Sequence, residues 1–284
     1  MTSEQIAVYH PYVWYASATW CQPNTTLTWT CGENCNENPT FRPLASGGDG
    51  IEVQMWFVGY DPTLQTVIVA HQGTNVVTIL GDLADADVPQ LPLNPLLFPG
   101  VSPLVMVHDG FMNEQALTAM TILNTVNTAI TRFGATNVTT VGHSLGAALA
   151  LIDGVFLRLR LPSTITVSVY GFGMPRVGNQ AFADYVDSQL PNLVSRVNNR
   201  CTSVPIVPPL TGTFGYHHPS GEKHIMDDGS WVACAGQDNT DTRCSTGDVP
   251  TIIQGKKADH SGPYAGTGLE SIGMGCCDSD IGCI

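Results

Sequence analysis

One short stretch holds the residue types that a nucleophilic hydrolase needs, Gly142-His143-Ser144-Leu145-Gly146. It follows a β-favouring run, Asn137 to Val141, and precedes a helix-favouring run, Ala147 to Leu161. In this strand–turn–helix setting, the pattern Gly-x-Ser-x-Gly predicts a nucleophile elbow. Side chains at the two glycine positions would collide with neighbouring atoms, and the helix N-terminus favours negative charge near the serine hydroxyl. The stretch therefore predicts Ser144 as a catalytic nucleophile.

A general base must accompany this serine, because a serine hydroxyl is not nucleophilic at neutral pH without one. The base in turn needs a neighbouring group that holds its tautomer. In hydrolases built around such an elbow, the acid and the histidine follow the serine along the chain. His260 lies in a polar segment near the C-terminus, where this order places the base. Order alone leaves four candidates open, His217, His218, His224 and His260.

Strands and helices alternate around the elbow, which predicts an α/β fold with a mostly parallel central sheet flanked by helices. The helix expected at 113–133 has an apolar stripe of Leu117, Met120, Leu123, Val126 and Ile130. No repeat or linker is visible, so we predict one domain over residues 1–284, with residues 1–50 packed on it. The remaining expected elements are helix at 4–20, loop at 21–50, a hairpin of strands at 51–60 and 65–70, strands at 164–170 and 193–197, a helix at 181–189, and a hairpin at 223–233.

Composition narrows the range of partners. The chain has 284 residues, 43% hydrophobic and 12% charged, with a formal net charge of -13. A phosphate backbone needs a basic footprint, so this charge argues against nucleic acid, and it would also repel anionic membranes. The sequence has no run of some 18 apolar residues, so we expect neither a transmembrane helix nor a stable membrane anchor. No signal-peptide core follows Met1, so we expect a mature form with an added initiator methionine.

Nine cysteines indicate disulfide bonds and an oxidising compartment, because several lie in polar loops and no Cys/His spacing suggests zinc. Two pairs, Cys31–Cys35 and Cys234–Cys244, are close enough in sequence to close one loop each. The odd count leaves at least one cysteine without a partner in the chain. N-x-[ST] sequons at Asn24 and Asn137 are compatible with secretion. We therefore predict a secreted, extracellular protein.

Several motifs make the chain resemble the class 3 (fungal) triacylglycerol lipases over about residues 50–265. The tract Gly-x-Pro-Arg-x-Gly-Asn at 173–179 is more discriminating than the elbow. Shorter matches lie at 197–199, 204–205 and 221–222. The main matching motifs are His71-Gln72-Gly73-Thr74, Val107-His108-Asp109-Gly110-Phe111, Val141 to Gly146, Gly171 to Asn179, and Asp259-His260.

The resemblance implies an α/β-hydrolase in which Ser144 is the nucleophile and His260 the general base. It places the oxyanion hole at the backbone N–H groups of Thr74 and Leu145, with the Thr74 hydroxyl assisting. One donor then follows the nucleophile and the other comes from a separate strand end, so both point at one developing oxyanion. Residues 76–88 would form a short amphipathic lid helix, although a helix packed permanently on the core has the same spacing.

The acid of the triad departs from the family pattern. An aspartate is expected a few residues before Val204-Pro205, but residues 198–203 contain no carboxylate. Counting back from Val204 puts Thr202 in the position of the aspartate, and a shift of one residue would put Cys201 there. Threonine can accept a neutral hydrogen bond, but it cannot supply the charge that stabilises imidazolium. Asp259 is next to His260 in sequence and poorly placed to bond its far ring nitrogen, and Asp227 and Asp228 lie in a different loop. Natural weakening, deliberate substitution and a replacement carboxylate from elsewhere in the fold remain open.

The resemblance also bears on the remaining cysteines. It suggests that Cys21 ties the N-terminal segment to Cys276, Cys277 or Cys283. Cys201, in the loop of the triad acid, is then the unpaired thiol. Full connectivity does not follow from sequence.

The leading hypothesis is a secreted carboxylic-ester hydrolase, a triacylglycerol lipase that works at lipid–water interfaces through a serine acyl-enzyme and is impaired by Thr202. The apolar stripe of residues 76–88 and the apolar run at 91–98 favour lipid. Two alternatives remain, an esterase for feruloyl, aryl or other soluble esters, and a lipid- or ester-binding protein without useful turnover. No cofactor or metal is implied, because Asp278 with Asp280 is too little for calcium. The oligomeric state is not predicted.

Overall fold

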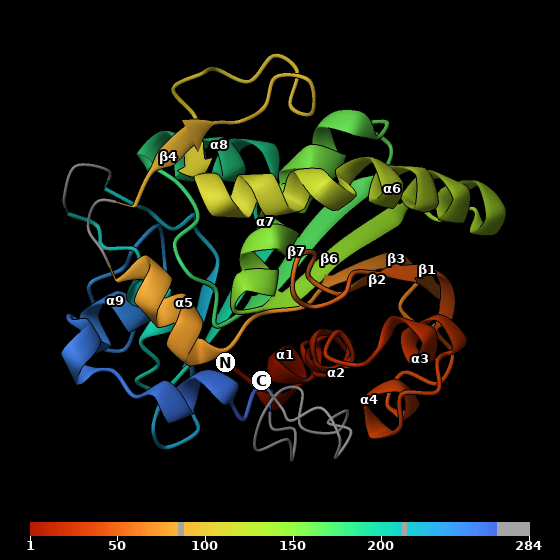
Figure 1. Cartoon of the computed structure of the whole chain (residues 1–284). Helices are drawn as coiled ribbons and strands as arrows, with labels where there is room; N and C mark the ends of the chain where they lie inside the picture. The colour runs from red at the N-terminus through yellow and green to blue at the C-terminus, as the bar shows by residue number, and fades with distance from the viewer. Residues whose placement is uncertain (85–87, 212–214, 266–284) are drawn as a thin grey trace.

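An eight-stranded sheet forms the centre of this computed structural model, which describes residues 1–84, 88–211 and 215–265 (Figure 1). Its strand order is β1-β2-β3-β6-β7-β8-β9-β10. Strands β3 to β9 of this order run parallel, whereas β1, β2 and β10 are antiparallel additions at the edges. The prediction of a mostly parallel sheet is confirmed. The strands are β1 (Arg42–Gly47), β2 (Trp56–Asp61), β3 (Thr66–His71), β6 (Asn137–His143), β7 (Thr166–Phe172), β8 (Val194–Asn199), β9 (Glu222–Ile225) and β10 (Trp231–Ala233).

Helices cover both faces of this sheet, with α6, α7 and α8 on one face and α1 to α4 on the other (Figure 1). Alternation along β3 shows why both faces need cover. Val67 and Val69 join the core under α6 and α7, whereas Ile68 and Ala70 join the core under α2. The helices of the two layers are α1 (Ser3–Ala7), α2 (His10–Ala18), α3 (Pro23–Thr28), α4 (Glu33–Asn36), α6 (Asp109–Phe133), α7 (Leu145–Arg160) and α8 (Gln180–Gln189).

Short elements surround the carboxyl ends of the parallel strands. A separate two-stranded sheet pairs β4 (Gln90–Pro92) with β5 (Met106–His108). Helix α5 (Val76–Leu83) follows β3 and falls within the predicted lid at 76–88, of which residues 85–87 lie outside the described residues. The remaining short helices are α9 (Ser245–Asp248), η1 (Val204–Ile206), η2 (Ile252–Gln254) and η3 (Lys257–Ser261).

The predicted apolar stripe of α6 is partly wrong. Leu117 and Met120 are 61% and 49% exposed, whereas Leu123 and Val126 are buried as expected. The buried face is rotated to include Gln115, whose amide donates to a carboxylate oxygen of Asp153 in α7 at 2.7 Å. A hydrophobicity pattern misses this rotation because it assigns a polar side chain to the solvent side.

The N-terminal region is more ordered than the sequence suggested. The predicted loop at 21–50 contains α3, α4 and the edge strand β1. Pro43 lies within β1, which an edge strand tolerates but which weakens the strand signal in the sequence. The predicted hairpin is confirmed as β2 paired with β3, although β2 begins at Trp56 rather than at residue 51.

The disulfide bonds agree with the sequence-based expectation. Cys31–Cys35 and Cys234–Cys244 both form, and Cys201 is a free thiol. Cys21 is also disulfide-bonded. The cysteines proposed as its partner, Cys276, Cys277 and Cys283, lie outside the described residues, as do Asp278 and Asp280.

Candidate active site

Ser144 lies on a sharp turn between β6 and α7. Its backbone has φ 59° and ψ −126°, a conformation that a non-glycine residue adopts only under constraint. A Cβ on Gly142 would collide with the carbonyl of Gly146, and a Cβ on Gly146 would collide with the carbonyl of His71. These contacts explain why both positions of the elbow are glycine. The serine is thereby raised at the N-terminus of α7.

The loop after β3 runs directly beside this serine. A Cβ on Gly73 would lie 2.6 Å from the carbonyl oxygen of His143 and 3.2 Å from the Cβ of Ser144. Thr74 follows immediately, so its backbone lies next to the nucleophile. Leu145 is the first residue of α7, and the first N–H groups of a helix have no partner within it. The two proposed oxyanion donors therefore belong to segments that meet at Ser144.

His260 is the candidate base that lies beside the elbow. It is 1% exposed, and its ring lies against that of His143, with 4.4 Å between ring centroids. Its carbonyl oxygen accepts hydrogen bonds from Nε2–H of His143 at 2.8 Å and from the hydroxyl of Tyr264 at 2.9 Å. Asn199, at the end of β8, donates to the preceding carbonyl of Asp259 at 2.9 Å. Hydrogen bonds to backbone thus position this histidine from several elements.

The other three candidate bases make contacts elsewhere. His217 lies 3.3 Å from a carboxylate oxygen of Asp238, and His218 binds the carbonyl of Pro205 at 2.7 Å. Both ring nitrogens of His224 contact backbone carbonyls beyond β9. Of the four histidines left open by the sequence, the structure brings His260 to the elbow.

Thr202 lies beside the ring of His260. Its Oγ1 is 3.2 Å from Nδ1 of His260, and the side chain is fully buried. Of the two registers left open by the sequence, the structure therefore puts Thr202, rather than Cys201, next to the ring. No carboxylate within residues 1–84, 88–211 and 215–265 forms an ion pair with His260. Asp227 and Asp259 instead approach the thiol of Cys201. One carboxylate oxygen of each and the Cys201 Sγ lie within 4.8 Å of one another.

A threonine hydroxyl differs from a carboxylate in two ways. A carboxylate only accepts, so it fixes the proton on Nδ1 and leaves Nε2 free to take the serine proton. The Thr202 hydroxyl can donate or accept, so it does not select a tautomer. A carboxylate also stabilises the imidazolium that forms in the transition state, and a neutral hydroxyl lacks that charge.

The surroundings of His260 oppose a charged imidazole. Burial, together with the neighbouring His143, holds the pKa of His260 well below its usual range. Burial likewise lowers the pKa of His143 to about 4. Both imidazoles are therefore neutral at neutral pH, and the proton of His143 lies on Nε2, where it is donated to the His260 carbonyl.

The site is closed to solvent in this conformation. Ser144 is 0% exposed, and α5 lies against η1 and against η3, which carries His260. Neither Oγ of Ser144 nor Nε2 of His260 has a hydrogen-bond partner among the described residues. Catalytic hydrogen bonds are often long in unliganded enzymes and shorten when substrate binds.

A buried polar cluster at the end of β3 was not predicted from the sequence. Nε2 of His71, the last residue of β3, lies 2.8 Å from Asp153, which also accepts from Gln115. All three side chains are buried. The contact ties the end of β3 to α7, the helix that follows Ser144. The one sequence signal of this contact was Asp153, a charged residue in the middle of an apolar helix.

Comparison with known proteins agrees with this geometry. The family model "Lipase (class 3)" matches residues 68–212. Secreted mono- and diacylglycerol lipase MDL3 of Malassezia globosa is 32% identical over 243 residues, covering 84% of this chain and 76% of the relative. The Rhizomucor miehei lipase–propeptide complex superposes with a TM-score of 0.78 at 26% identity, covering 98% of this chain and 84% of the other. A triacylglycerol lipase described as having a serine protease triad superposes with a TM-score of 0.77 at 27% identity, covering 95% and 98%.

The sheet and its helical layers are those of an α/β-hydrolase, as the sequence predicted. Within that class, the chain belongs to the class 3 lipases, and it is a serine ester hydrolase. The resemblance drawn from the motifs is confirmed.

Replacement of Thr202 by aspartate tests the missing charge. We expect Thr202→Asp to raise turnover of a soluble ester at least ~100-fold, because loss of a triad acid has cost ~10⁴-fold. The new carboxylate should also raise the pKa of His260. In the wild type the base stays neutral as the pH falls, so kcat/KM should persist below pH 6; in Thr202→Asp the acid limb should move to higher pH.

The matched control is Thr202→Asn, which adds a similar volume without a charge. It should leave both the turnover and the acid limb close to those of the wild type. Equal rates for the aspartate variant and the wild type would show that a carboxylate already serves His260.

Proposed function

We propose that the chain hydrolyses acylglycerol esters at a lipid–water interface, with Ser144 as nucleophile, His260 as general base and Thr202 in place of the triad acid. The observation that carries this proposal is the arrangement at the elbow. Ser144 has a strained backbone, the loop after β3 passes beside it at Gly73, and the buried ring of His260 lies 3.2 Å from the Thr202 hydroxyl. The names of the relatives, which are mono- and diacylglycerol and triacylglycerol lipases, support the substrate class.

The proposed reaction has two halves, formation of the acyl-enzyme and its hydrolysis, and His260 transfers the proton in both. Oγ of Ser144 attacks the ester carbonyl carbon while Nε2 of His260 takes the hydroxyl proton. The carbonyl oxygen becomes an oxyanion that accepts hydrogen bonds from the N–H groups of Thr74 and Leu145. When the intermediate collapses, His260 returns the proton to the departing alcohol and an acyl-enzyme remains. Water, deprotonated by the same imidazole, then releases the fatty acid and restores the serine.

We propose helix α5 as the lid over this site. Asn75 caps its N-terminus by accepting from the N–H of Val77 at 2.8 Å. Ile79, Leu80 and Leu83 are buried beneath it, whereas Val77 is 59% exposed. Displacement of α5 would expose these apolar side chains, which water opposes and a lipid surface accepts.

Substrate aggregation tests the lid. With tributyrin as substrate, the hydrolysis rate should rise steeply once the concentration exceeds solubility, because droplets stabilise the open helix. Ser144→Ala should abolish the rate on both sides of that point. Smooth saturation below the solubility limit would instead support the alternative of an esterase for soluble feruloyl or aryl esters.

Thr202 specifically favours a second function, a binding protein that retains ester or lipid affinity without useful turnover. The two functions differ in the reactivity of Ser144. A serine-directed alkyl phosphonate should label the wild-type protein within minutes, with mass spectrometry locating the adduct on Ser144, and Ser144→Ala should remain unlabelled. Absence of labelling in the folded wild type would support the binding function.

We also propose an extracellular location. Relatives are named as secreted lipases, and Cys31–Cys35, Cys234–Cys244 and the disulfide of Cys21 fit an oxidising compartment. None of the helices in the described part of the chain has the length and apolar character required to cross a bilayer.

The two sequons provide a test of this location, because the structure distinguishes them. Asn24 is exposed in the first turn of α3, whereas Asn137 is half-buried at the start of β6 and its amide donates to the carbonyl of Gln65. Secretion from yeast should therefore attach one glycan, at Asn24. Asn24→Gln should remove the shift in mass produced by an endoglycosidase, and Asn137→Gln should leave it unchanged; the opposite pattern would contradict the assignment.

A further inference from the structure

His224 is a buried side chain whose two ring nitrogens both contact carbonyl oxygens. It lies in β9 and is 0% exposed. Its Nδ1 is 2.8 Å from the carbonyl oxygen of Arg243, and its Nε2 is 2.9 Å from the carbonyl oxygen of Arg200. A carbonyl oxygen accepts hydrogen bonds and cannot donate them.

Two such contacts require two N–H donors on one ring. Neutral imidazole carries a single N–H, and the cation carries two. We propose that His224 is held as a buried imidazolium, and that it is a positioning residue that keeps Thr202 against the proposed base His260. The inference rests on the proposed roles of Thr202 and His260.

The surroundings supply the negative charge that a buried cation needs. Oδ2 of Asp248, in α9, lies 3.9 Å from Nε2 of His224. Glu222 lies two residues away on β9 and therefore on the same side of the strand. The side chain of Arg243 is ion-paired with Asp241 at 2.8 Å. Other titratable or charged residues on β8, β9 and the segments packed beside them include Arg196, whose Nη2 lies 4.0 Å from Glu222, and Lys223, Arg200, Cys201, Asp227 and Lys256.

The contact with Arg200 links this cation to the proposed active site. Arg200 precedes Thr202 by two residues, and its own N–H donates to Ile225 at 2.8 Å. The segment is held further by the bonds from Thr202 N–H to Asn199 and from Lys256 N–H to the Cys201 carbonyl, at 3.2 and 2.7 Å. His224 thus holds the start of the short turn that brings Thr202 to within 3.2 Å of Nδ1 of His260.

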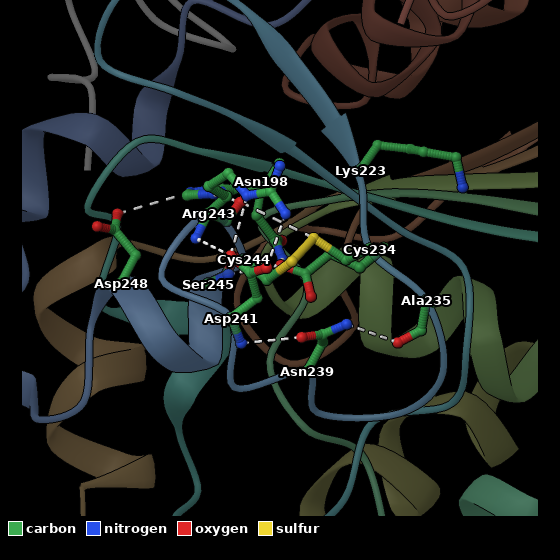
Figure 2. The surroundings of a disulfide bond; sticks show 12 residues. Asn198, Lys223, Cys234, Ala235, Asn239, Asp241, Arg243, Cys244, Ser245 and Asp248 are labelled. Carbon is green, nitrogen blue, oxygen red and sulfur yellow. Dashed lines mark hydrogen bonds and ion pairs between the residues drawn. A yellow bond between two sulfur atoms is a disulfide. The ribbon is translucent and has the colours of Figure 1, made fainter.

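The contact with Arg243 fixes the other side of His224. Arg243 precedes Cys244, and the disulfide with Cys234 closes this loop (Figure 2). Asn239 spans the loop, donating to the carbonyl of Ala235 and accepting from the N–H of Asp241, as Figure 2 shows. The loop is therefore a rigid support. The His224 cation connects this loop, through Arg243, to the turn that carries Thr202, through Arg200. Loss of one ring proton would break one of these two hydrogen bonds.

A direct test observes the ring nitrogens of the wild-type protein. Histidine labelled with ¹⁵N should show two protonated, nearly equivalent nitrogens for His224 at pH 7 in long-range ¹H–¹⁵N spectra, with the signals assigned from His224→Gln. His218 and His143 are internal controls. Each bonds through Nε2, and its Nδ1 has no partner among the described residues, so each should show one protonated and one bare nitrogen. A bare nitrogen on His224 at pH 7 would overturn the proposal.

A kinetic test asks whether His224 acts through Thr202. With a soluble p-nitrophenyl ester, His224→Gln should lower kcat about tenfold with little change in KM, a coupling of ordinary size for residues of one network. In a Thr202→Val background, where the hydroxyl is already absent, the same substitution should have no further effect on kcat. Equal losses in both backgrounds would refute the positioning role.

The pH profile supplies a readout that does not require the variant to fold. The kcat/KM of the wild type should fall at the pH at which the spectra show the His224 nitrogens becoming inequivalent, and a fall unrelated to that pH would contradict the link. Phosphonate labelling of Ser144 reports on the proposed function separately. If labelling fails, the catalytic roles fall, while the spectra still decide the charge of His224.

Discussion

Crowding of backbone around Ser144 is the constraint on which the rest of the structure depends. The ends of β3 and β6 and the start of α7 meet at His71, Gly142 and Gly146 with no room for a side chain between them. A serine with φ 59° persists there because its surroundings over-determine it. The buried contact of His71 with Asp153 ties the same strand to the same helix further from the turn. The parallel order of strands brings these ends to one edge of the sheet, so the architecture and the junction support each other.

A catalytic base depends both on its position and on a neighbouring charge that stabilises its protonated form. In this chain the proposed base, His260, has the first and lacks the second. Tyr264 and His143 hold the His260 backbone, and Thr202 contacts its ring, so the geometry is specified. None of these contacts supplies a negative charge to stabilise imidazolium. The burial that completes the geometry also lowers the pKa of His260, which moves the base further from the charged form. The proposed base is therefore well positioned, but its protonated form receives little electrostatic stabilisation.

The sequence predicted the features that depend on local pattern. The strands β6 and β7 are rich in β-branched residues, and the helices between the strands have clear periodicity, so the parallel sheet was predictable. β1 was missed because Pro43 and its edge position weaken the strand pattern, and the phase of α6 was misassigned because Gln115 faces inward. Counting from Val204-Pro205 gave Thr202, the register in which the structure places it. The contacts of His71 with Asp153 and of His224 with two carbonyls join segments far apart in the chain, and no local pattern encodes such pairings.

One short segment carries two of the proposed devices. Thr74, a proposed oxyanion donor, is followed at once by Asn75, whose side chain caps the proposed lid helix α5. The capped end of α5 therefore lies one residue from the proposed oxyanion donor. Rotation of α5 about its capped end would turn the peptide that carries the donor, so opening and transition-state stabilisation share a mechanical joint. Sequence variation along the lid would then tune the intrinsic chemistry of the enzyme as well as its access to substrate.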